Sequence, residues 1–153
     1  MIALLQRVSR ASVRVEGKLV GECARGLLVL FCAERGDGPE AVLKLARKTA
    51  RLRIFEDDAG KMNKSVLDLS GGALVVSQFT LAADCRGGNR PSFTGAADPE
   101  AGRALYERYV EALASEGVSV QTGRFGAHME VSLVNDGPVT MWLRIPPELG
   151  HTA

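Results

Sequence analysis

The hydrophobic positions along the chain follow two periods. Between residues 2 and 33 apolar and polar side chains alternate, and the alternation pauses at Glu16-Gly17 and Arg25-Gly26. This pattern predicts two or three antiparallel strands joined by tight turns. The run 71–84 is short and apolar and begins with two glycines, which predicts another strand. Further strands are predicted around 118–122 and 129–145.

Two segments between these strands have the period of a helix instead. The first lies within 37–55 and begins near Asp37 and Pro39. The second begins at Asp98-Pro99-Glu100, which supplies an N-cap, a first-turn proline and an acid, and it ends at Gly117. The residues predicted to be buried are Val42, Leu45, Ala46, Thr49 and Leu52 on the first helix, and Ala101, Ala104, Leu105, Tyr109, Ala112 and Leu113 on the second.

These elements predict an α+β fold with a mostly antiparallel, barrel-like sheet and two main helices. A chain of 153 residues with 46% hydrophobic residues suits one domain with a real core, which we place at 1–145, followed by a frayed tail at 146–153. No segment reaches about 18 consecutive apolar residues, and the start of the chain lacks the features of a signal peptide. We therefore expect a cytoplasmic protein with reduced cysteines and no membrane association.

The strand predicted at 129–145 contains a proline where a sheet does not tolerate one. Its apolar residues fall on every second position, yet Pro138 has no N–H to donate to a neighbouring strand. The preceding Asn135-Asp136-Gly137 is typical of turns. One interpretation is a plain hairpin turn, and the other is a bend that meets a ligand.

Few side chains suit nucleophilic or metal chemistry. The chain has two histidines, and because His151 lies in the tail, His128 is the only reasonable general base; a lone histidine next to a strand start is more often structural. Cys85 stands in the long loop 85–98 without an evident activating group. The three cysteines lack metal-binding spacing, and no phosphate-binding glycine motif occurs, so we expect neither metal nor cofactor.

The stretch 77–80, "SQFT", places polar side chains at the end of the apolar run 71–84. Unless the strand bends, Gln78 and Thr80 share one face and Ser77 and Phe79 share the other. A hydroxyl, an amide and an aromatic ring suit the binding of a small polar group. A polar strand end satisfied by neighbouring backbone is the alternative.

Together, "SQFT" and "NDGPVT" resemble the signatures of the D-aminoacyl-tRNA deacylases. The supporting stretches are "MIALLQRVSRASVRVEG", "GLLVLFCAE", "RIFEDDAGKMNKSV", "VVSQFTLAAD", "RPSF", "QTGRFGAHMEVSLVNDGPVT" and "MWL". They run in order over nearly the whole chain. Neither signature is specific alone, but the pair is.

The resemblance implies a homodimeric hydrolase that cleaves the ester joining a D-amino acid to the terminal adenosine of tRNA, and that also acts on glycyl-tRNA. It implies an active site at the dimer interface. By residue matching, the catalytic signature is Ser77, Gln78, Phe79 and Thr80. Gly137 and Pro138 are implied to form a cis peptide bond that reaches into the partner's site and rejects L-amino acids, and the substrate-binding set also includes Asn135, Phe125 and Met129.

Several alternatives stay open. The family mechanism has the free ribose hydroxyl activate water, whereas a rival mechanism uses Thr80 as nucleophile. Phe79 either stacks on an unpaired base or belongs to the core. The cations of the first helix either contact phosphates or form a solvated face; they are Lys44, Arg47, Lys48 and Arg51. The net charge of +1 offers no large electrostatic field for duplex nucleic acid. The competing functions are a non-catalytic RNA- or nucleotide-binding module and a general esterase.

Overall fold

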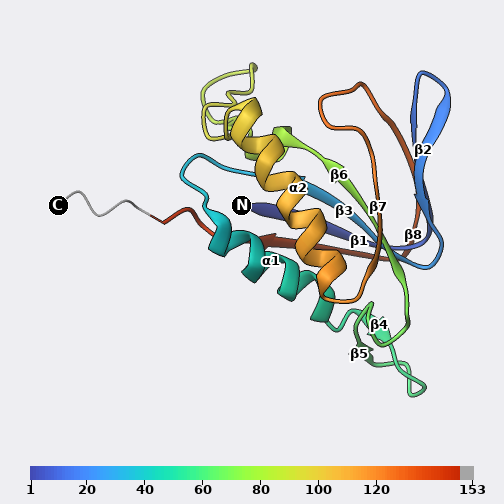
Figure 1. Cartoon of the computed structure of the whole chain (residues 1–153). Coiled ribbons are helices and arrows are strands. Elements are labelled where there is room, and N and C mark those ends of the chain that lie inside the picture. Colours follow the sequence, from blue (N-terminus) through green and yellow to red (C-terminus); the bar gives the residue numbers. More distant parts are fainter. Residues whose placement is uncertain (149–153) are drawn as a thin grey trace.

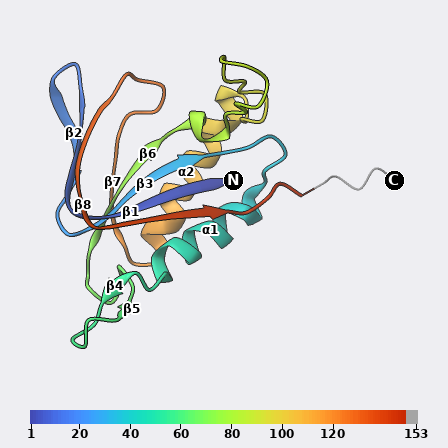
Figure 2. The ribbon, with the colours of Figure 1, turned by 180° about the vertical axis from the view of Figure 1, so that it is seen from behind.

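The computed structural model describes residues 1–148, which form a six-stranded sheet, two helices and a small hairpin. The helices lie side by side over one face of the sheet, and the hairpin and the long loop before α2 lie at opposite ends (Figures 1 and 2). In chain order the elements are β1 (Ile2–Val15), β2 (Lys18–Cys23), β3 (Gly26–Cys32), α1 (Pro39–Arg51), β4 (Phe55–Glu56), β5 (Met62–Lys64), β6 (Gly72–Ser77), the 3₁₀ turn η1 (Phe79–Ala82), α2 (Pro99–Ser115), β7 (Ser119–Thr122) and β8 (Glu130–Arg144).

The sheet is mixed, which corrects the expectation of a mostly antiparallel one. β1 pairs antiparallel with β2, β3 and β8, but β3 with β6 and β6 with β7 pair in parallel. Each parallel pair is joined by a segment that contains a helix, because parallel neighbours require a long crossover. The backbone amide of Glu22 on β2 donates to Gln121 Oε1 on β7 at 2.9 Å, so the sheet nearly closes into the expected barrel.

The predicted helices are confirmed, with one error about the buried face of α2. Asp98 caps α2 by accepting a hydrogen bond from the Ala101 amide at 3.0 Å. Ala101 and Ala104, predicted to be buried, are exposed, whereas Tyr106 is buried. The large aromatic side chains determine which face of this helix meets the sheet, because they bury more apolar area than alanine does.

Two tyrosines of α2 fix the helix layer in place. The Tyr106 hydroxyl donates to the Val75 carbonyl of β6 at 2.9 Å. The Tyr109 hydroxyl lies 2.8 Å from Thr49 Oγ1 of α1, and its ring stacks on Phe31 of β3 at 4.8 Å between centroids. These contacts hold the N-terminal end of α2 above the ends of β3 and β6, where the site described below is found.

The outer face of α1 has the character of a solvated surface. Arg47 and Arg51 lie 3.7 and 3.5 Å from carboxylate oxygens of Glu116, and both arginines are largely exposed. Lys44 and Lys48 are exposed on the same helix. Because Glu116 balances two of the four cations on this face, the structure favours a solvated surface over a phosphate-binding site here.

The predicted tail lies only partly within the described chain. Residues 145–148 have no regular secondary structure, and 149–153, with His151, lie outside the described residues. No helix within 1–148 is long and apolar enough to cross a membrane.

Candidate active site at the end of β6

The apolar strand predicted at 71–84 ends early, so the expected alternation of the "SQFT" side chains does not occur. β6 stops at Ser77, the Gln78 amide donates to the Phe31 carbonyl at 2.7 Å, and the chain then turns into η1. Gln78 Nε2 donates to Thr80 Oγ1. The first N–H groups of a helical turn have no partner inside the turn, and those of Phe79 and Thr80 donate to no other backbone carbonyl within residues 1–148.

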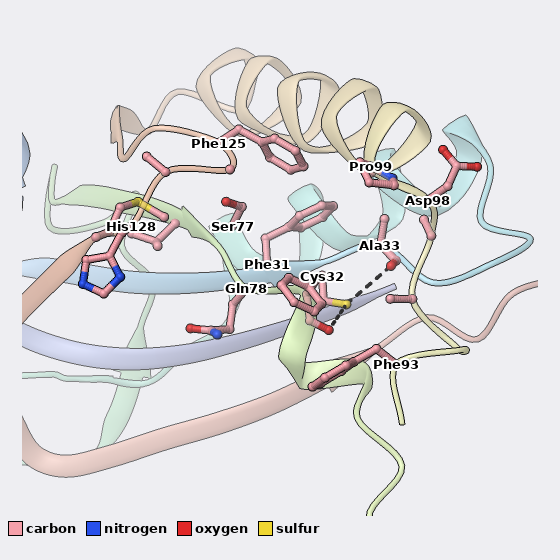
Figure 3. Close-up of a pocket in the computed structure, with 18 of the residues that line it drawn as sticks. Phe31, Cys32, Ala33, Ser77, Gln78, Phe93, Asp98, Pro99, Phe125 and His128 are labelled. Carbon is pink, nitrogen blue, oxygen red and sulfur yellow. Dashed lines mark hydrogen bonds between the residues drawn. The ribbon is translucent and has the colours of Figure 1, made fainter. Parts of the chain in front are cut away.

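A cavity of about 650 Å³ opens beside this turn. Of the predicted site residues, Ser77, Gln78, Phe79, Phe125 and Met129 line it. Its walls also include the ends of β3 and β6, the first turn of α2 and the loop before β8, and Figure 3 shows the Phe125 ring facing Ser77 from below α2. Most of its lining is apolar: Phe31, Cys32, Ala33, Val76, Phe93, Ala96, Ala97, Pro99, Gly102, Ala127 and Val131.

The remaining predicted residues lie elsewhere in the chain. Thr80 is exposed and does not line the cavity; its hydroxyl contacts Gln78 instead. Asn135, Gly137 and Pro138 belong to β8, and none of them lines the cavity of its own chain. The two signatures, which were expected to form one site, therefore occupy two separate parts of the chain.

The Gly137-Pro138 bond is cis, and it lies in an exposed bend that β1 does not pair. The β1–β8 register jumps from Gln6 opposite Thr140 to Val8 opposite Asn135, which leaves residues 136–139 outside the ladder. We call residues 136–139 the β8 bend. Asn135 secures it locally, since its Oδ1 accepts from the Val139 amide and its Nδ2 donates to Thr140 Oγ1, each at 2.9 Å.

Arg7 supports the β8 bend from beneath, and the sequence interpretation missed it. Its side chain is buried at 6% exposure, with Nε donating to the Asp136 carbonyl and Nη1 to the Ile54 carbonyl, both at 2.8 Å. Arg7 falls in the same alternating phase as the buried Ala3 and Leu5. An arginine on the inward phase of a strand was the available signal, because a buried cation requires partners.

The structure offers no support for a hydrolytic triad. His128 lines the cavity, but its ring makes no hydrogen bond within the described part of the chain. Figure 3 places His128 and Asp98 at opposite ends of the site, and Asp98 is occupied in capping α2. Among residues 1–148 no group of three or more His, Cys, Asp or Glu side chains is arranged to hold a metal ion.

Phe79 lies on the surface, so the interpretation of this side chain as core is wrong. It is 58% exposed, and its ring meets Phe93 edge to face at 5.1 Å between centroids. Both rings line the cavity. Exposed aromatic rings at a cavity mouth offer a surface on which a nucleobase can stack.

Alkylation with iodoacetamide at mildly alkaline pH is expected to modify Cys85 first. Burial, reinforced by the charge of Glu34, raises the pKa of the Cys32 thiol to about 11, and burial also raises the pKa of Cys23. Cys85 is exposed, and the thiolate is the reactive form. Peptide mass mapping gives the order of modification. Early labelling of Cys32, or loss of activity when Cys85 alone is labelled, would bring a thiol mechanism back into consideration.

The cavity lies at the carboxyl ends of the parallel strands β3 and β6, which is where proteins with parallel strands commonly bind their ligands. Residues 4–144 match the D-Tyr-tRNA(Tyr) deacylase family. Relatives named D-aminoacyl-tRNA deacylase include one from Ruegeria pomeroyi, 62% identical and covering 95% of this chain and 100% of the relative, and one from Paracoccus denitrificans, 62% identical with 94% and 96% covered. The solved structure of a c-Myc DNA Unwinding Element Binding Protein is 39% identical, with a TM-score of 0.90 over 95% of this chain and 99% of that one.

The chain belongs to the D-Tyr-tRNA(Tyr) deacylase family. The resemblance drawn from the two signatures is thereby confirmed, as is the expectation of an enzyme of the deacylase class. A probable eukaryotic D-amino acid tRNA deacylase of known structure, 20% identical with a TM-score of 0.80 over 94% of this chain and 98% of that one, shares the fold.

Proposed function

We propose that this chain hydrolyses the ester between a D-amino acid and the terminal adenosine of tRNA, acts on glycyl-tRNA as well, and proofreads chirality in the cytoplasm. The observation that carries the proposal is the cavity at the end of β6, whose apolar lining suits a nucleobase and an amino-acid side chain beside the polar Ser77 and Gln78. Residues 1–145 act as one catalytic domain and 146–153 as a tail. The reaction uses no metal and no cofactor.

The ester is held where its oxyanion meets backbone donors. Hydrolysis passes through a tetrahedral intermediate whose negative oxygen needs hydrogen-bond donors in place beforehand. We assign this role to the N–H groups of Phe79 and Thr80 at the start of η1, because they donate to no other backbone carbonyl within residues 1–148 and Phe79 lines the cavity. Backbone amides cannot change rotamer, so they require little reorganisation during the reaction.

Two copies of the chain complete each site. The outward positions of β8 carry Val134 at 39% exposure and Trp142 at 54%, and Pro138 is exposed between them. The same face carries the exposed polar residues Ser132, Asp136 and Thr140, and such a mixture of apolar and polar side chains occurs at protein–protein interfaces. We place the β8 bend of one protomer over the cavity of its partner, which accounts for the absence of Gly137 and Pro138 from the cavity of their own chain.

Chirality is read by exclusion at the β8 bend. Main-chain carbonyls turned out of the ladder accept hydrogen bonds from the substrate ammonium group, while the amides of η1 hold the ester. With both groups fixed, the side chain of a D-residue points into open space, and that of an L-residue collides with the Gly137-Pro138 backbone. Glycine has no side chain and escapes this filter.

Replacing Thr80 with alanine is expected to leave at least about a tenth of the turnover, because a group that only orients the site contributes less than a nucleophile. Thr80 Oγ1 contacts Gln78 and does not line the cavity, which supports an orienting role beside a ribose hydroxyl that activates water. Single-turnover hydrolysis of D-tyrosyl-tRNA measures the effect. Near-complete inactivation with the fold and tRNA binding intact would assign Thr80 as the nucleophile.

The decisive assay compares D-tyrosyl-tRNA and L-tyrosyl-tRNA side by side. We expect release of D-tyrosine, with the L-ester hydrolysed at least about a hundred-fold more slowly because the bend excludes its side chain. Glycyl-tRNA should fall between the two. Hydrolysis of small activated esters at the same rate as the tRNA ester would indicate a general esterase.

A non-catalytic nucleic-acid-binding module is the second candidate. One observation favours it: the structural neighbour that is 39% identical is named for binding a DNA element. Equal protection of both tyrosyl-tRNAs without release of amino acid would support this candidate and exclude the deacylase.

A further inference from the structure

Arg35 stands at the cavity without a role in the chemistry described so far. It is exposed and lines the cavity. Its Nε donates to the Thr94 carbonyl at 2.6 Å, and its backbone amide donates to the Gly95 carbonyl at 3.0 Å. Within residues 1–148 the guanidinium forms no ion pair with an acid. Its two Nη groups are therefore free to donate elsewhere.

The loop that orients Arg35 is itself well anchored. Asp84 and Ser92 exchange two backbone hydrogen bonds at 2.7 and 2.8 Å, which closes the loop at its base. The Ala97 amide donates to the Ala33 carbonyl at 3.0 Å, and Phe93 packs on Phe79. A guanidinium held by one nitrogen on a fixed loop loses less side-chain entropy when it binds a ligand than a free one does.

We propose that Arg35 binds the phosphodiester that joins the terminal nucleotide to the rest of the RNA; this inference rests on the proposed function. The apolar cavity takes the nucleoside and its amino acid, so the first negative charge of the substrate emerges at the mouth. Among the lining residues within 1–148, Arg35 is the only arginine or lysine. The forked guanidinium matches the geometry of phosphate oxygens.

The neighbouring cations lack this combination of properties. Arg86 is 91% exposed, but Asp84 holds it through Nε at 2.9 Å and Nη2 at 2.8 Å, and it does not line the cavity. The pairing raises the pKa of Arg86 and lowers that of Asp84 to about 2, so both groups stay charged and neutralise each other. Arg86, which belongs to the loop 85–98 that holds the Arg35 side chain, is thus a matched control.

The test compares two D-tyrosyl esters that differ in one phosphate: one on adenosine and one on adenosine 5′-monophosphate. For Arg35→Ala we expect kcat/KM to fall about ten- to one-hundred-fold on the phosphorylated ester and on D-tyrosyl-tRNA, with a loss at least about five-fold smaller on the nucleoside ester. Arg35→Lys should recover part of the loss, and Arg86→Ala should change neither substrate by more than about two-fold. The salt dependence of kcat/KM on tRNA should weaken by about one phosphate contact in Arg35→Ala.

Two outcomes overturn the inference. Equal losses on both esters would show that Arg35 acts by holding the loop, and unchanged kcat/KM on both would show that it contacts nothing. If the wild-type protein hydrolyses no D-aminoacyl ester, the proposed function fails by itself. Titration of wild type and Arg35→Ala with adenosine 5′-monophosphate and with adenosine then still tests the phosphate contact. The Arg35→Ala variant should bind the nucleotide more weakly than wild type does and should bind adenosine equally well.

Discussion

Gly102→Phe is expected to reduce hydrolysis of D-tyrosyl-tRNA by at least about a hundred-fold, because a ring in the cavity displaces the reacting end of the substrate. Gly102 lies in the first turns of α2 and lines the cavity. A Cβ built on it would have Phe125 Cζ at 3.8 Å as its nearest neighbour, so the space beyond it belongs to the cavity rather than to the core. The phenylalanine can therefore enter without unfolding the protein, and single-turnover assays with circular dichroism separate the two effects.

Two matched variants make this result specific. Gly102→Ala adds only a methyl group at ordinary contact distance, and it should raise stability by about 0.5–1 kcal/mol, as alanine does in a helix. Ala104→Phe puts the same ring on the exposed side of α2 and should leave hydrolysis within about two-fold of wild type. Full activity of Gly102→Phe would mean that the substrate binds elsewhere.

The helices and the strands of the main sheet could be predicted from local pattern, but the short β4–β5 hairpin and the pairing of the strands could not. The α2 start at Asp98-Pro99 is a local signal, and the structure contains the cap. The parallel pairing of β3 with β6 depends on where the chain returns after α1, which no single strand encodes. A partial signal exists: 26–32 and 72–77 are nearly continuous apolar runs, which is typical of parallel strands buried on both faces.

The candidate site could be predicted only as far as its two signatures. The segment 77–80 does lie at a cavity, but the turn after Ser77 depends on a hydrogen bond to Phe31 of another strand. Phe125 and Met129 were identified through the resemblance, since loop residues have no period. Arg7 and Arg35 reach their positions through carbonyls far away in sequence, which neither composition nor spacing records.

Gly137→Ala is expected to reduce D-tyrosyl-tRNA hydrolysis by about a hundred-fold or more, because a displaced bend no longer holds the ammonium group. Gly137 has a φ of +143°, and a Cβ there would lie 2.7 Å from Val139 Cγ2 and 2.8 Å from the Val139 amide nitrogen. The bend must shift to relieve these contacts, which breaks the Asn135 hydrogen bond to Val139 and the Arg7 hydrogen bond to Asp136. Stability should fall by about 1–3 kcal/mol, measured by urea unfolding.

Gly60→Ala is a control that measures the loss of stability from a positive φ alone, without any displacement of the β8 bend. Gly60 has a φ of +78° with no atom within 4 Å of its Cβ position, and it lies in the turn between β4 and β5. Alanine there should cost about 1 kcal/mol of stability and leave hydrolysis unchanged. If Gly137→Ala behaves in the same way, the β8 bend plays no part in the reaction.

Mixing Gly137→Ala with Gly102→Phe distinguishes action within one protomer from action on the partner. In a heterodimer of the two variants, one site combines the open cavity of the Gly137→Ala chain with the intact β8 bend of the Gly102→Phe chain. Random pairing of equal amounts makes half of the dimers mixed, so coexpression should restore about one quarter of wild-type activity if the bend acts on the partner. If the bend served its own cavity, every site in the mixture would carry a defect, and activity would stay at the level of the two variants alone.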